Sequence, residues 1–187
     1  SHLQNELEVV YLSANKNMTL FLDQIKKYQP KSVCIVDEES YSMVKEEIYS
    51  LNIEILCGRP GLLELAKRTD VDVMLNALVG APGMEPTLFA IEAGVDVALS
   101  NKESLVMAGN IINKAQQKSG AEIFPVDSEH SAIWQCLIGE ELVDVNRIIL
   151  TGSGGPFRKR DISSFNNITV KEALNHPNWD MGKKITI

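Results

Sequence analysis

The chain has 187 residues, of which 44% are hydrophobic and 23% are charged, and these shares are those of an ordinary soluble globular protein. Its formal net charge of -7 argues against nucleic acid or an anionic membrane as a partner, but a few local cations could still hold a small anionic substrate. No apolar run approaches the roughly 20 residues that span a bilayer, and no basic segment leads into an apolar core as in a signal peptide.

The three cysteines, Cys34, Cys57 and Cys136, are odd in number and far apart. Their spacing fits neither a zinc site nor a disulfide framework. We therefore expect a reducing, cytoplasmic compartment.

Short runs rich in β-branched residues alternate with segments of helical periodicity along the chain. The expected strands cover residues 8–13, 32–36, 54–56, 71–77, 95–99, 122–126 and 147–151. The expected helices lie near residues 19–28, 39–50, 60–67, 85–92, 103–118 and 130–138. Strands that are apolar throughout indicate a sheet buried on both faces, and the βα alternation predicts a doubly wound, parallel, Rossmann-like α/β fold.

Both ends of this pattern indicate an incomplete sheet. A dinucleotide-binding fold opens with a strand and a Gly-rich turn that receives the pyrophosphate, whereas this chain enters what reads as a second strand almost at once. The last residues, 184–187, look like a strand being entered. The sequence therefore predicts a fragment.

The turn after the first expected strand carries Asn15, Lys16 and Asn17. NAD-binding folds place an acid near this point to grip the ribose 2′-hydroxyl, but here Lys16 and two amides could accept a 2′-phosphate instead. This favours NADP over NAD. An equally weighted alternative is a polar turn that caps a helix starting at Met18.

Two further turns follow strands. Residues 76–83 run from a strand into two glycines, which would let backbone approach a ligand, although a plain βα turn is as well supported. Lys102 stands between Asn101 and Glu103 at the end of another strand, where α/β folds bind ligands. The alternative is that Glu103 and Ser104 merely open the next helix.

The segment 125–130 offers two carboxylates, Asp127 and Glu129, on either side of Ser128. In an extended segment, positions i and i+2 point to the same side and would present hard oxygen ligands to Mg²⁺ or Mn²⁺. The alternative is that Asp127 or Ser128 caps the following helix. We expect His130 to be structural and not a ligand.

Two later segments could contact a ligand. Ser153 lies among glycines, so that its hydroxyl and free backbone N–H groups could bind phosphate or phosphonate oxygens. His176, Trp179 and Met181 fall within one short loop that could form a lid, although a loop burying its Trp is equally supported.

Four segments in this order closely resemble 1-deoxy-D-xylulose 5-phosphate reductoisomerase, and the resemblance runs from residue 7 to residue 187. The most specific matches are residues 101–106, 125–130, 150–158 and 176–179. The resemblance implies an NADPH- and metal-dependent enzyme that rearranges and reduces 1-deoxy-D-xylulose 5-phosphate to 2-C-methyl-D-erythritol 4-phosphate in non-mevalonate isoprenoid synthesis. It also implies an NADPH-binding domain over residues 1–126, the start of an α/β catalytic domain over residues 127–187, and a homodimer in the full-length family.

The resemblance assigns roles residue by residue. The implied metal ligands are Asp127 and Glu129, for Mg²⁺ or Mn²⁺. The implied catalytic residues are Lys102, Asp127, Glu129 and His176. The implied contacts to the sugar phosphate are Lys102, Ser128, Glu129, Ser153 and His176. The implied contacts to NADPH are Asn15, Lys16, Asn17, Asn101, Glu103 and Gly182.

The family's opening Gly-rich turn and everything after residue 187, including a third metal carboxylate, are absent from this sequence. We therefore expect the parent protein to be an enzyme and this chain alone to be inactive. Two alternatives remain, namely a different NADP-linked dehydrogenase and a non-catalytic nucleotide-binding module.

Overall fold

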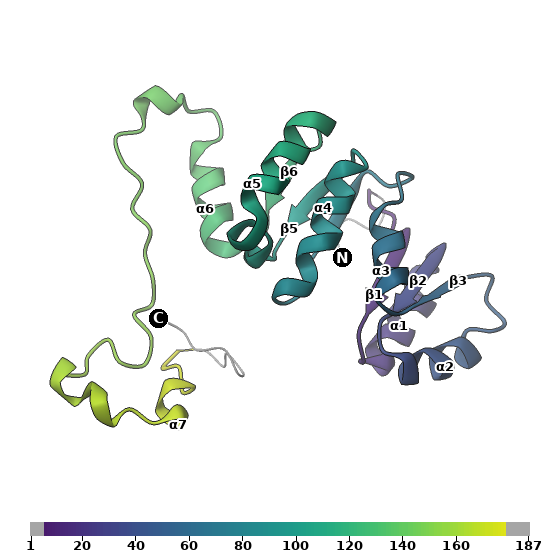
Figure 1. Cartoon of the computed structure of the whole chain (residues 1–187), viewed down its shortest axis with the longest axis horizontal. Helices are drawn as coiled ribbons and strands as arrows, with labels where there is room; N and C mark the ends of the chain where they lie inside the picture. Colours follow the sequence, from purple (N-terminus) through teal and green to yellow (C-terminus); the bar gives the residue numbers. More distant parts are fainter. Residues whose placement is uncertain (1–5, 179–187) are drawn as a thin grey trace. The chain divides into compact units, whose positions relative to one another are not determined.

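The computed structural model describes residues 6–178, and these form two compact units. The first unit extends to Cys136 and the second begins at Leu137 (Figure 1). This division by compactness does not test the functional domain boundary predicted at residue 126, which stays a prediction.

The first unit opens with a parallel sheet in the order β1-β2-β3. Its elements in chain order are β1 (Tyr11–Ala14), α1 (Met18–Tyr28), β2 (Ser32–Ile35), α2 (Glu38–Glu47), β3 (Glu54–Cys57) and α3 (Gly58–Ala66). Strand β2 is buried along its whole length because helices cover both faces. Val33 and Ile35 pack with α1 and α2, whereas Cys34 packs with Leu62 and Leu65 of α3. This is the expected double winding.

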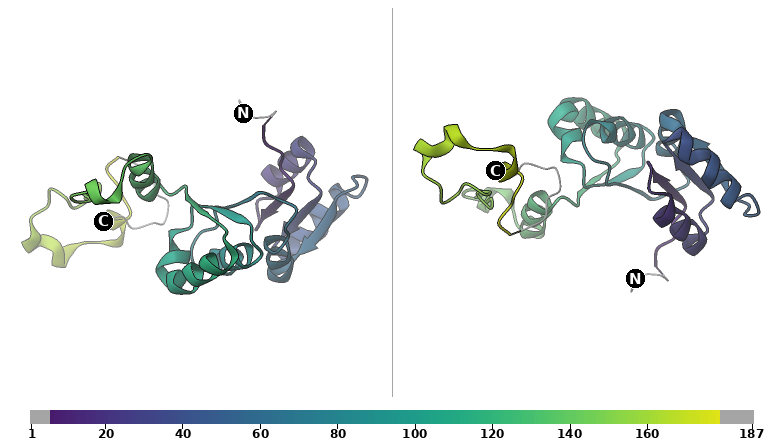
Figure 2. Two further views of the ribbon diagram at one scale, coloured as in Figure 1. Left: turned by 90° about the horizontal axis from the view of Figure 1, so that it is seen from above. Right: turned by 90° about the horizontal axis from the view of Figure 1, so that it is seen from below.

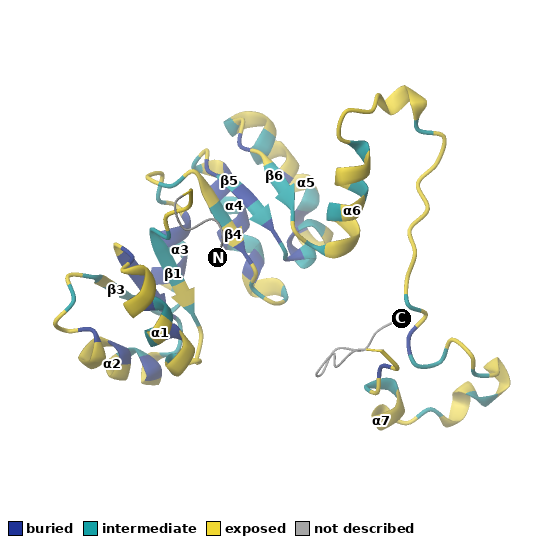
Figure 3. Ribbon diagram, turned by 180° about the vertical axis from the view of Figure 1, so that it is seen from behind, coloured by how far each residue is buried: buried dark blue, intermediate teal, exposed yellow. Residues whose placement is uncertain are grey.

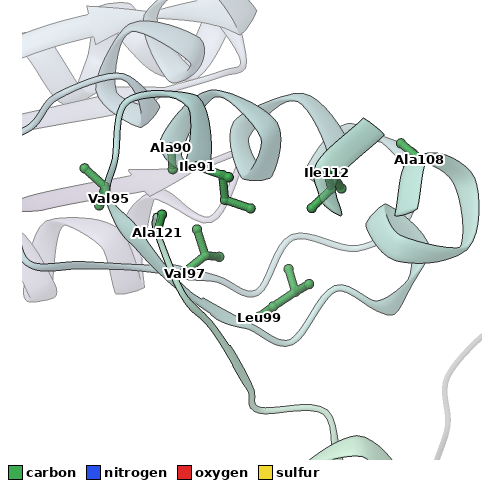
Figure 4. Packing of buried hydrophobic residues seen from close by; sticks show 8 residues of the cluster. All are labelled: Ala90, Ile91, Val95, Val97, Leu99, Ala108, Ile112 and Ala121. Atoms are coloured by element: carbon green, nitrogen blue, oxygen red, sulfur yellow. The ribbon is translucent and has the colours of Figure 1, made fainter. Parts of the chain in front are cut away.

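A second parallel sheet follows in the order β4-β5-β6. Its elements are β4 (Val73–Asn76), η1 (Ala81–Gly83), α4 (Met84–Glu92), β5 (Asp96–Leu99), α5 (Lys102–Ser119), β6 (Ile123–Pro125) and α6 (Ser128–Leu137). Helices α4 and α5 pack against each other, as the two views of Figure 2 show. Their apolar faces meet β5 in one core cluster, drawn in Figure 4, of Ala90, Ile91, Val95, Val97, Leu99, Ala108, Ile112 and Ala121.

Helix α5 is bent. Ala108 has non-helical backbone angles (φ -134°, ψ 20°), so the first turns, which begin at Lys102, are offset from the rest of the helix. The helix ends at Gly120, whose φ of 80° is the left-handed conformation that glycine adopts at least cost. The helix predicted near residues 103–118 is confirmed.

The second unit contains only short helices in its described part, namely η2 (Leu142–Asp144), η3 (Ile162–Asn167) and α7 (Val170–Ala173). The sequence pattern did not anticipate them. Helix α7 begins with a capping box, in which Thr169 and Glu172 each satisfy the other's backbone N–H group.

The strand predicted over residues 147–151 is wrong for the described structure, where these residues form neither helix nor strand. A strand needs a neighbouring strand to pair its backbone groups, and none of the strands in the described sheets pairs with this segment. Its apolar side chains, Ile148, Ile149 and Leu150, are exposed, as are Leu142 and Val143 before them (Figure 3). The other six predicted strands are confirmed, with shifted ends.

Within residues 6–178, no helix combines the length and the apolar character needed to cross a membrane.

An ionic cluster ties the amino ends of the first three strands to the segment that leads into β4. The Arg68 guanidinium donates to Ser32 Oγ at 2.7 Å and lies 2.8 Å from Glu54 and 3.0 Å from Glu64. It also lies over the Tyr11 ring, 5.1 Å from the centroid. Desolvation opposes its charge, but bonds to Glu54, Glu64 and Tyr11 outweigh this and raise the pKa of Arg68.

Replacing this side chain, as in Arg68→Met, should destabilise the first unit by about 1–2 kcal/mol, because Ser32 and Glu54 lose a charged donor at a partly buried position. Urea unfolding of both proteins would measure the change. Lys114→Met, at an exposed position of α5, is the control and should unfold like the parent. Equal midpoints for Arg68→Met and Lys114→Met would contradict the expected role.

Candidate functional site

A cavity of about 830 Å³ opens at the carboxyl ends of the strands in the first unit. Its walls come from the turn after β1, the start of α3, the loop after β4, and helices α4 and α5. The lining residues are Asn15, Val36, Arg59, Leu62, Ala77, Leu78, Val79, Ala81, Pro82, Met84, Glu85 and Met107. Parallel α/β sheets bind ligands at this edge.

The turn after β1 places its three predicted residues differently. Asn15 lines the cavity. Lys16 is 72% exposed and pairs with Asp37 at 3.1 Å, and Asp37 itself caps α2. Asn17 caps α1 by accepting from Leu20 N at 3.3 Å. The alternative of a helix cap at Met18 is therefore correct for Asn17, while Asn15 and Lys16 remain open to a ligand.

Asp37 is a fixed negative charge beside this turn. Hydrogen bonds from the Ser40 side chain and backbone, together with the Lys16 ammonium, hold the pKa of Asp37 below its ordinary value. The Lys16 ammonium is thus held close to the end of the strand by a carboxylate that stays ionised.

Four side chains gather where β5 meets α5 and β6 meets α6. Lys102 Nζ lies 3.1 Å from Asp127 Oδ2 and 3.4 Å from Glu129 Oε2. The opposite oxygen of Asp127, Oδ1, lies 3.1 Å from His130 Nδ1. Both carboxylates therefore converge on one cation, and His130 orients Asp127 from behind.

The electrostatics of this cluster favour the ionised form of Asp127. Partial burial raises the pKa of Asp127, but hydrogen bonding with Glu129, Lys102 and His130 outweighs it, so that the pKa lies below its ordinary value. The hydrogen bond to Asp127 in turn raises the pKa of Lys102. The two carboxylates that approach this ammonium are hard oxygen donors of the kind that Mg²⁺ or Mn²⁺ prefers.

The local geometry differs from the predicted one. Residues 127–129 were expected to be extended, but α6 begins at Ser128, and Glu129 lies in its first turn. Asp127 O accepts from Ser131 N at 2.8 Å, as an N-cap carbonyl does. The functional and the capping interpretations are thus compatible, because the helix start itself turns both carboxylates toward Lys102. Ser128 is exposed at this helix start.

Ser153 and His176 meet within the second unit. Ser153 Oγ lies 3.0 Å from His176 Nε2 and accepts from Gly155 N at 3.1 Å. His176 Nδ1 accepts from Asn178 N at 3.1 Å, so the neutral ring carries its proton on Nε2 and donates it to Ser153. With both lone pairs of Oγ engaged, the Ser153 hydroxyl proton is directed to another acceptor.

The remaining predicted residues divide into two groups. Glu103 is half-buried in the first turn of α5, and Asn101 is fully buried at its N-cap. Gly182, and the lid residues Trp179 and Met181, lie outside the described residues.

Arg59 was missed by the sequence reasoning. It lines the cavity from the first turn of α3 and donates to Pro82 O and Glu85 Oε2, both at 2.6 Å. It thereby joins α3 to the loop and helix of the second sheet across the cavity wall. Its place in the sequence was a usable signal, because Arg59 comes two residues after the strand that ends at Cys57. Charged residues at the same place after other strands were predicted to contact ligands.

Comparison with known proteins decides the family. A family model described as 1-deoxy-D-xylulose 5-phosphate reductoisomerase matches residues 1–109, and a model of that enzyme's C-terminal domain matches residues 123–187. The chain belongs to this family.

Individual relatives agree. Two proteins named 1-deoxy-D-xylulose 5-phosphate reductoisomerase, from Chloroherpeton thalassium and Lachnoclostridium phytofermentans, are 47% and 44% identical to the chain. The alignments cover 98% and 97% of this chain, but 50% and 47% of those proteins. The chain thus spans about half the length of the curated relatives it matches.

Solved structures of the family superpose well on the chain. A DOX-P reductoisomerase crystallised with NADPH, fosmidomycin and magnesium has a TM-score of 0.84 and 36% identity, covering 97% of this chain and 47% of that one. The Zymomonas mobilis enzyme in complex with NADPH also has a TM-score of 0.84, with 37% identity over 92% of this chain and 45% of that one.

The charge on Lys102 should control the ionisation of Asp127. In Lys102→Met the pKa of Asp127 should rise, because a hydrogen-bonded cation is lost. A carboxylate with a lowered folded-state pKa stabilises the fold above its unfolded pKa, and this contribution disappears as the pH falls through the folded value. As the pH falls, the variant should therefore lose the stabilising contribution of ionised Asp127 at a higher pH than the parent does.

Carboxyl-carbon NMR titration would measure the Asp127 midpoint directly. Lys118→Met, near the far end of the same helix, is the matched control and should leave that midpoint in place. An unchanged midpoint in Lys102→Met would contradict the geometry described for the cluster.

Proposed function

We propose that this chain supplies the NADPH pocket and the first metal-binding carboxylates of a 1-deoxy-D-xylulose 5-phosphate reductoisomerase. The whole enzyme would convert 1-deoxy-D-xylulose 5-phosphate into 2-C-methyl-D-erythritol 4-phosphate with NADPH and a divalent metal ion. The observation that carries the proposal is the convergence of Asp127 and Glu129 on one cation, in a chain that belongs to this family.

The cavity at the strand ends is the proposed NADPH site. Asn15 lines it, and the neighbouring Lys16 offers an exposed ammonium to a 2′-phosphate in a turn that has no acid of its own. A relative with a TM-score of 0.84 was solved with NADPH. Asn17, Asn101, Glu103 and Gly182 remain proposed contacts to the same cofactor.

The carboxylates of Asp127 and Glu129 are the proposed ligands of Mg²⁺ or Mn²⁺. When bound, the metal would hold adjacent oxygens of the sugar phosphate and stabilise the negative charge that develops on them. Among residues 6–178 no group of three or more His, Cys, Asp and Glu side chains could hold a metal ion. Asp127 and Glu129 alone would leave most of the coordination sphere to water.

The proposed substrate contacts act through hydrogen bonds and charge. Lys102 would place its ammonium beside a substrate oxygen next to the carboxylates. Ser153, whose oxygen already accepts from Gly155 and His176, would donate its proton to an anionic oxygen such as a phosphate. Ser128 and Glu129 start α6 at the metal site and are proposed to contact the same substrate, as is His176.

The remaining assignments are proposals of the same kind. Residues 1–126 would belong to the cofactor domain and residues 127–187 to the catalytic domain, with Trp179 and Met181 in its lid. The family resemblance supports a homodimer. The three free cysteines support a reducing, cytoplasmic compartment, and the net charge of -7 argues against nucleic acid.

A chimera tests the proposal directly. If this chain replaces the matching half of the Chloroherpeton thalassium protein, the product should oxidise NADPH only in the presence of the pentulose phosphate and Mg²⁺. Asp127→Asn in the chimera should lower turnover by on the order of a hundredfold, because a metal-ligand oxygen is lost. Asp144→Asn, at an exposed position of η2, should keep full activity.

A folded chimera that binds NADPH but turns over equally well with Asn at position 127 would sink the metal assignment and favour a different NADP-linked dehydrogenase. A folded chimera that binds NADPH without any turnover would favour a non-catalytic nucleotide-binding module.

The 187-residue polypeptide by itself should not catalyse the reaction, because Asp127 and Glu129 hold a divalent ion only weakly on their own. The measurement is NADPH absorbance in the presence of the pentulose phosphate and Mn²⁺, with the active chimera as positive control. Steady oxidation by the polypeptide alone would falsify this expectation.

A further inference from the structure

A buried polar cluster lies directly beneath the cavity loop of residues 77–83. We call it the buried amide cluster, and it consists of Asn76, Thr87, Asn101 and Ser104. Asn101, Ser104 and Thr87 are 0% exposed, and Asn76 is 3% exposed. They come from the end of β4, from α4, from the N-cap of α5 and from its first turn, so the cluster joins three elements around the loop.

The Asn101 carboxamide is fully used inside the protein. Its Nδ2 donates to Leu78 O at 2.6 Å and to Gly80 O at 2.9 Å. Its Oδ1 accepts from Ser104 N at 2.9 Å and also from Ser104 Oγ. A carboxamide has two donor hydrogens and two acceptor lone pairs, so no capacity remains for a ligand.

Asn76 and Thr87 hold the other end of the loop. Asn76 Nδ2 donates to Gly83 O at 2.8 Å and to Thr87 Oγ1 at 2.7 Å, while its Oδ1 accepts from Leu78 N at 3.1 Å. Thr87 Oγ1 donates to Gly83 O at 2.9 Å. The carbonyls of Leu78, Gly80 and Gly83 are thus all bound by this cluster.

Packing restricts the loop as tightly as the hydrogen bonds do. A Cβ atom on Gly83 would lie 2.7 Å from Asn101 Cγ and Nδ2, far inside contact distance. Gly80 has a φ of 75°, which a side chain would strain. The path of the loop is therefore restricted by close contact with the Asn101 amide.

We infer that Asn101 is a positioning residue, whose side chain fixes the loop of residues 77–83 and the first turn of α5 to each other. Contact with the cofactor is then left to the backbone, and contact with the substrate to Lys102. This inference rests on the proposed function in one respect, namely that the cavity lined by this loop binds NADPH. It replaces a side-chain contact between Asn101 and the cofactor with an internal role.

The physical reason for such a device is that the loop and Lys102 serve two adjoining sites from different strands, because the loop lines the proposed cofactor cavity and Lys102 lies beside the proposed metal carboxylates. Leu78, Val79, Ala81 and Pro82 line the cavity, while Lys102 follows Asn101 directly. A buried, fully satisfied network costs little to maintain but is expensive to disturb, because each lost partner leaves a buried polar atom unpaired.

Hydrogen exchange tests the positioning role without any ligand. Asn101→Asp keeps the acceptor for Ser104 but turns both loop donations into contacts between a carboxylate and carbonyls. The backbone amides of the loop should then exchange about tenfold faster, while those of α1 serve as an unchanged internal reference. Thr87→Val should loosen the Gly83 end similarly, and Thr87→Ser, which keeps the hydroxyl, should exchange like the parent.

NADPH titration of the same 187-residue proteins, followed by nicotinamide fluorescence, supplies the second readout. Asn101→Asp and Thr87→Val should each weaken binding about tenfold, and Thr87→Ser should restore it. Weakened binding by Asn101→Asp with unchanged loop exchange would overturn the inference, because the side chain would then contact the cofactor itself. Unchanged loop exchange in both disruptive variants would overturn it as well.

The two hypotheses can fail separately. If the parent chain does not bind NADPH, the cofactor assignment fails, whereas the exchange rates still decide whether Asn101 shapes the loop. If Asn101→Asp does not fold, Thr87→Val against Thr87→Ser decides the same question with a smaller change.

Discussion

The Lys102 ammonium between two carboxylates is the interaction on which the candidate site depends. Lys102 Nζ lies 3.1 Å from Asp127 and 3.4 Å from Glu129, and its charge contributes to the lowered pKa of Asp127. The three residues come from the carboxyl ends of neighbouring strands, β5 and β6, so the parallel pairing of those strands brings them together. The register between β5 and β6 thus determines that Lys102 lies beside Asp127 and Glu129.

Several side chains join the elements that surround this interaction. The buried amide cluster fixes the loop after β4 and the start of α5, and Arg59 joins the same loop to α3. His130 holds the rear oxygen of Asp127. Arg68 binds a second set of polar groups at the amino ends of the first three strands. Charged or amide side chains thus link the elements at both the carboxyl and the amino ends of the strands.

The sequence predicted those parts of the fold that depend on local pattern. Apolar runs and helical periodicity located six strands and their helices, and polar residues at strand ends predicted Lys102 and the two carboxylates as site residues. Features that depend on long-range contact were not predictable. Nothing in the residues around Arg59 or Asn76 reveals that their partners lie in other elements. Residues 147–151 have the composition of a strand, but whether a strand forms depends on a neighbouring strand to pair with, which the segment's own sequence does not reveal.

The exposed apolar side chains around Ile149 have a practical consequence for work in solution. Exposed runs of bulky aliphatic side chains of high β-propensity can associate with the same segment of another molecule. We expect the isolated polypeptide to self-associate as its concentration rises, at a rate set by this region and not by the cofactor pocket. Light scattering across a dilution series would therefore set the working range for every spectroscopic titration of this chain.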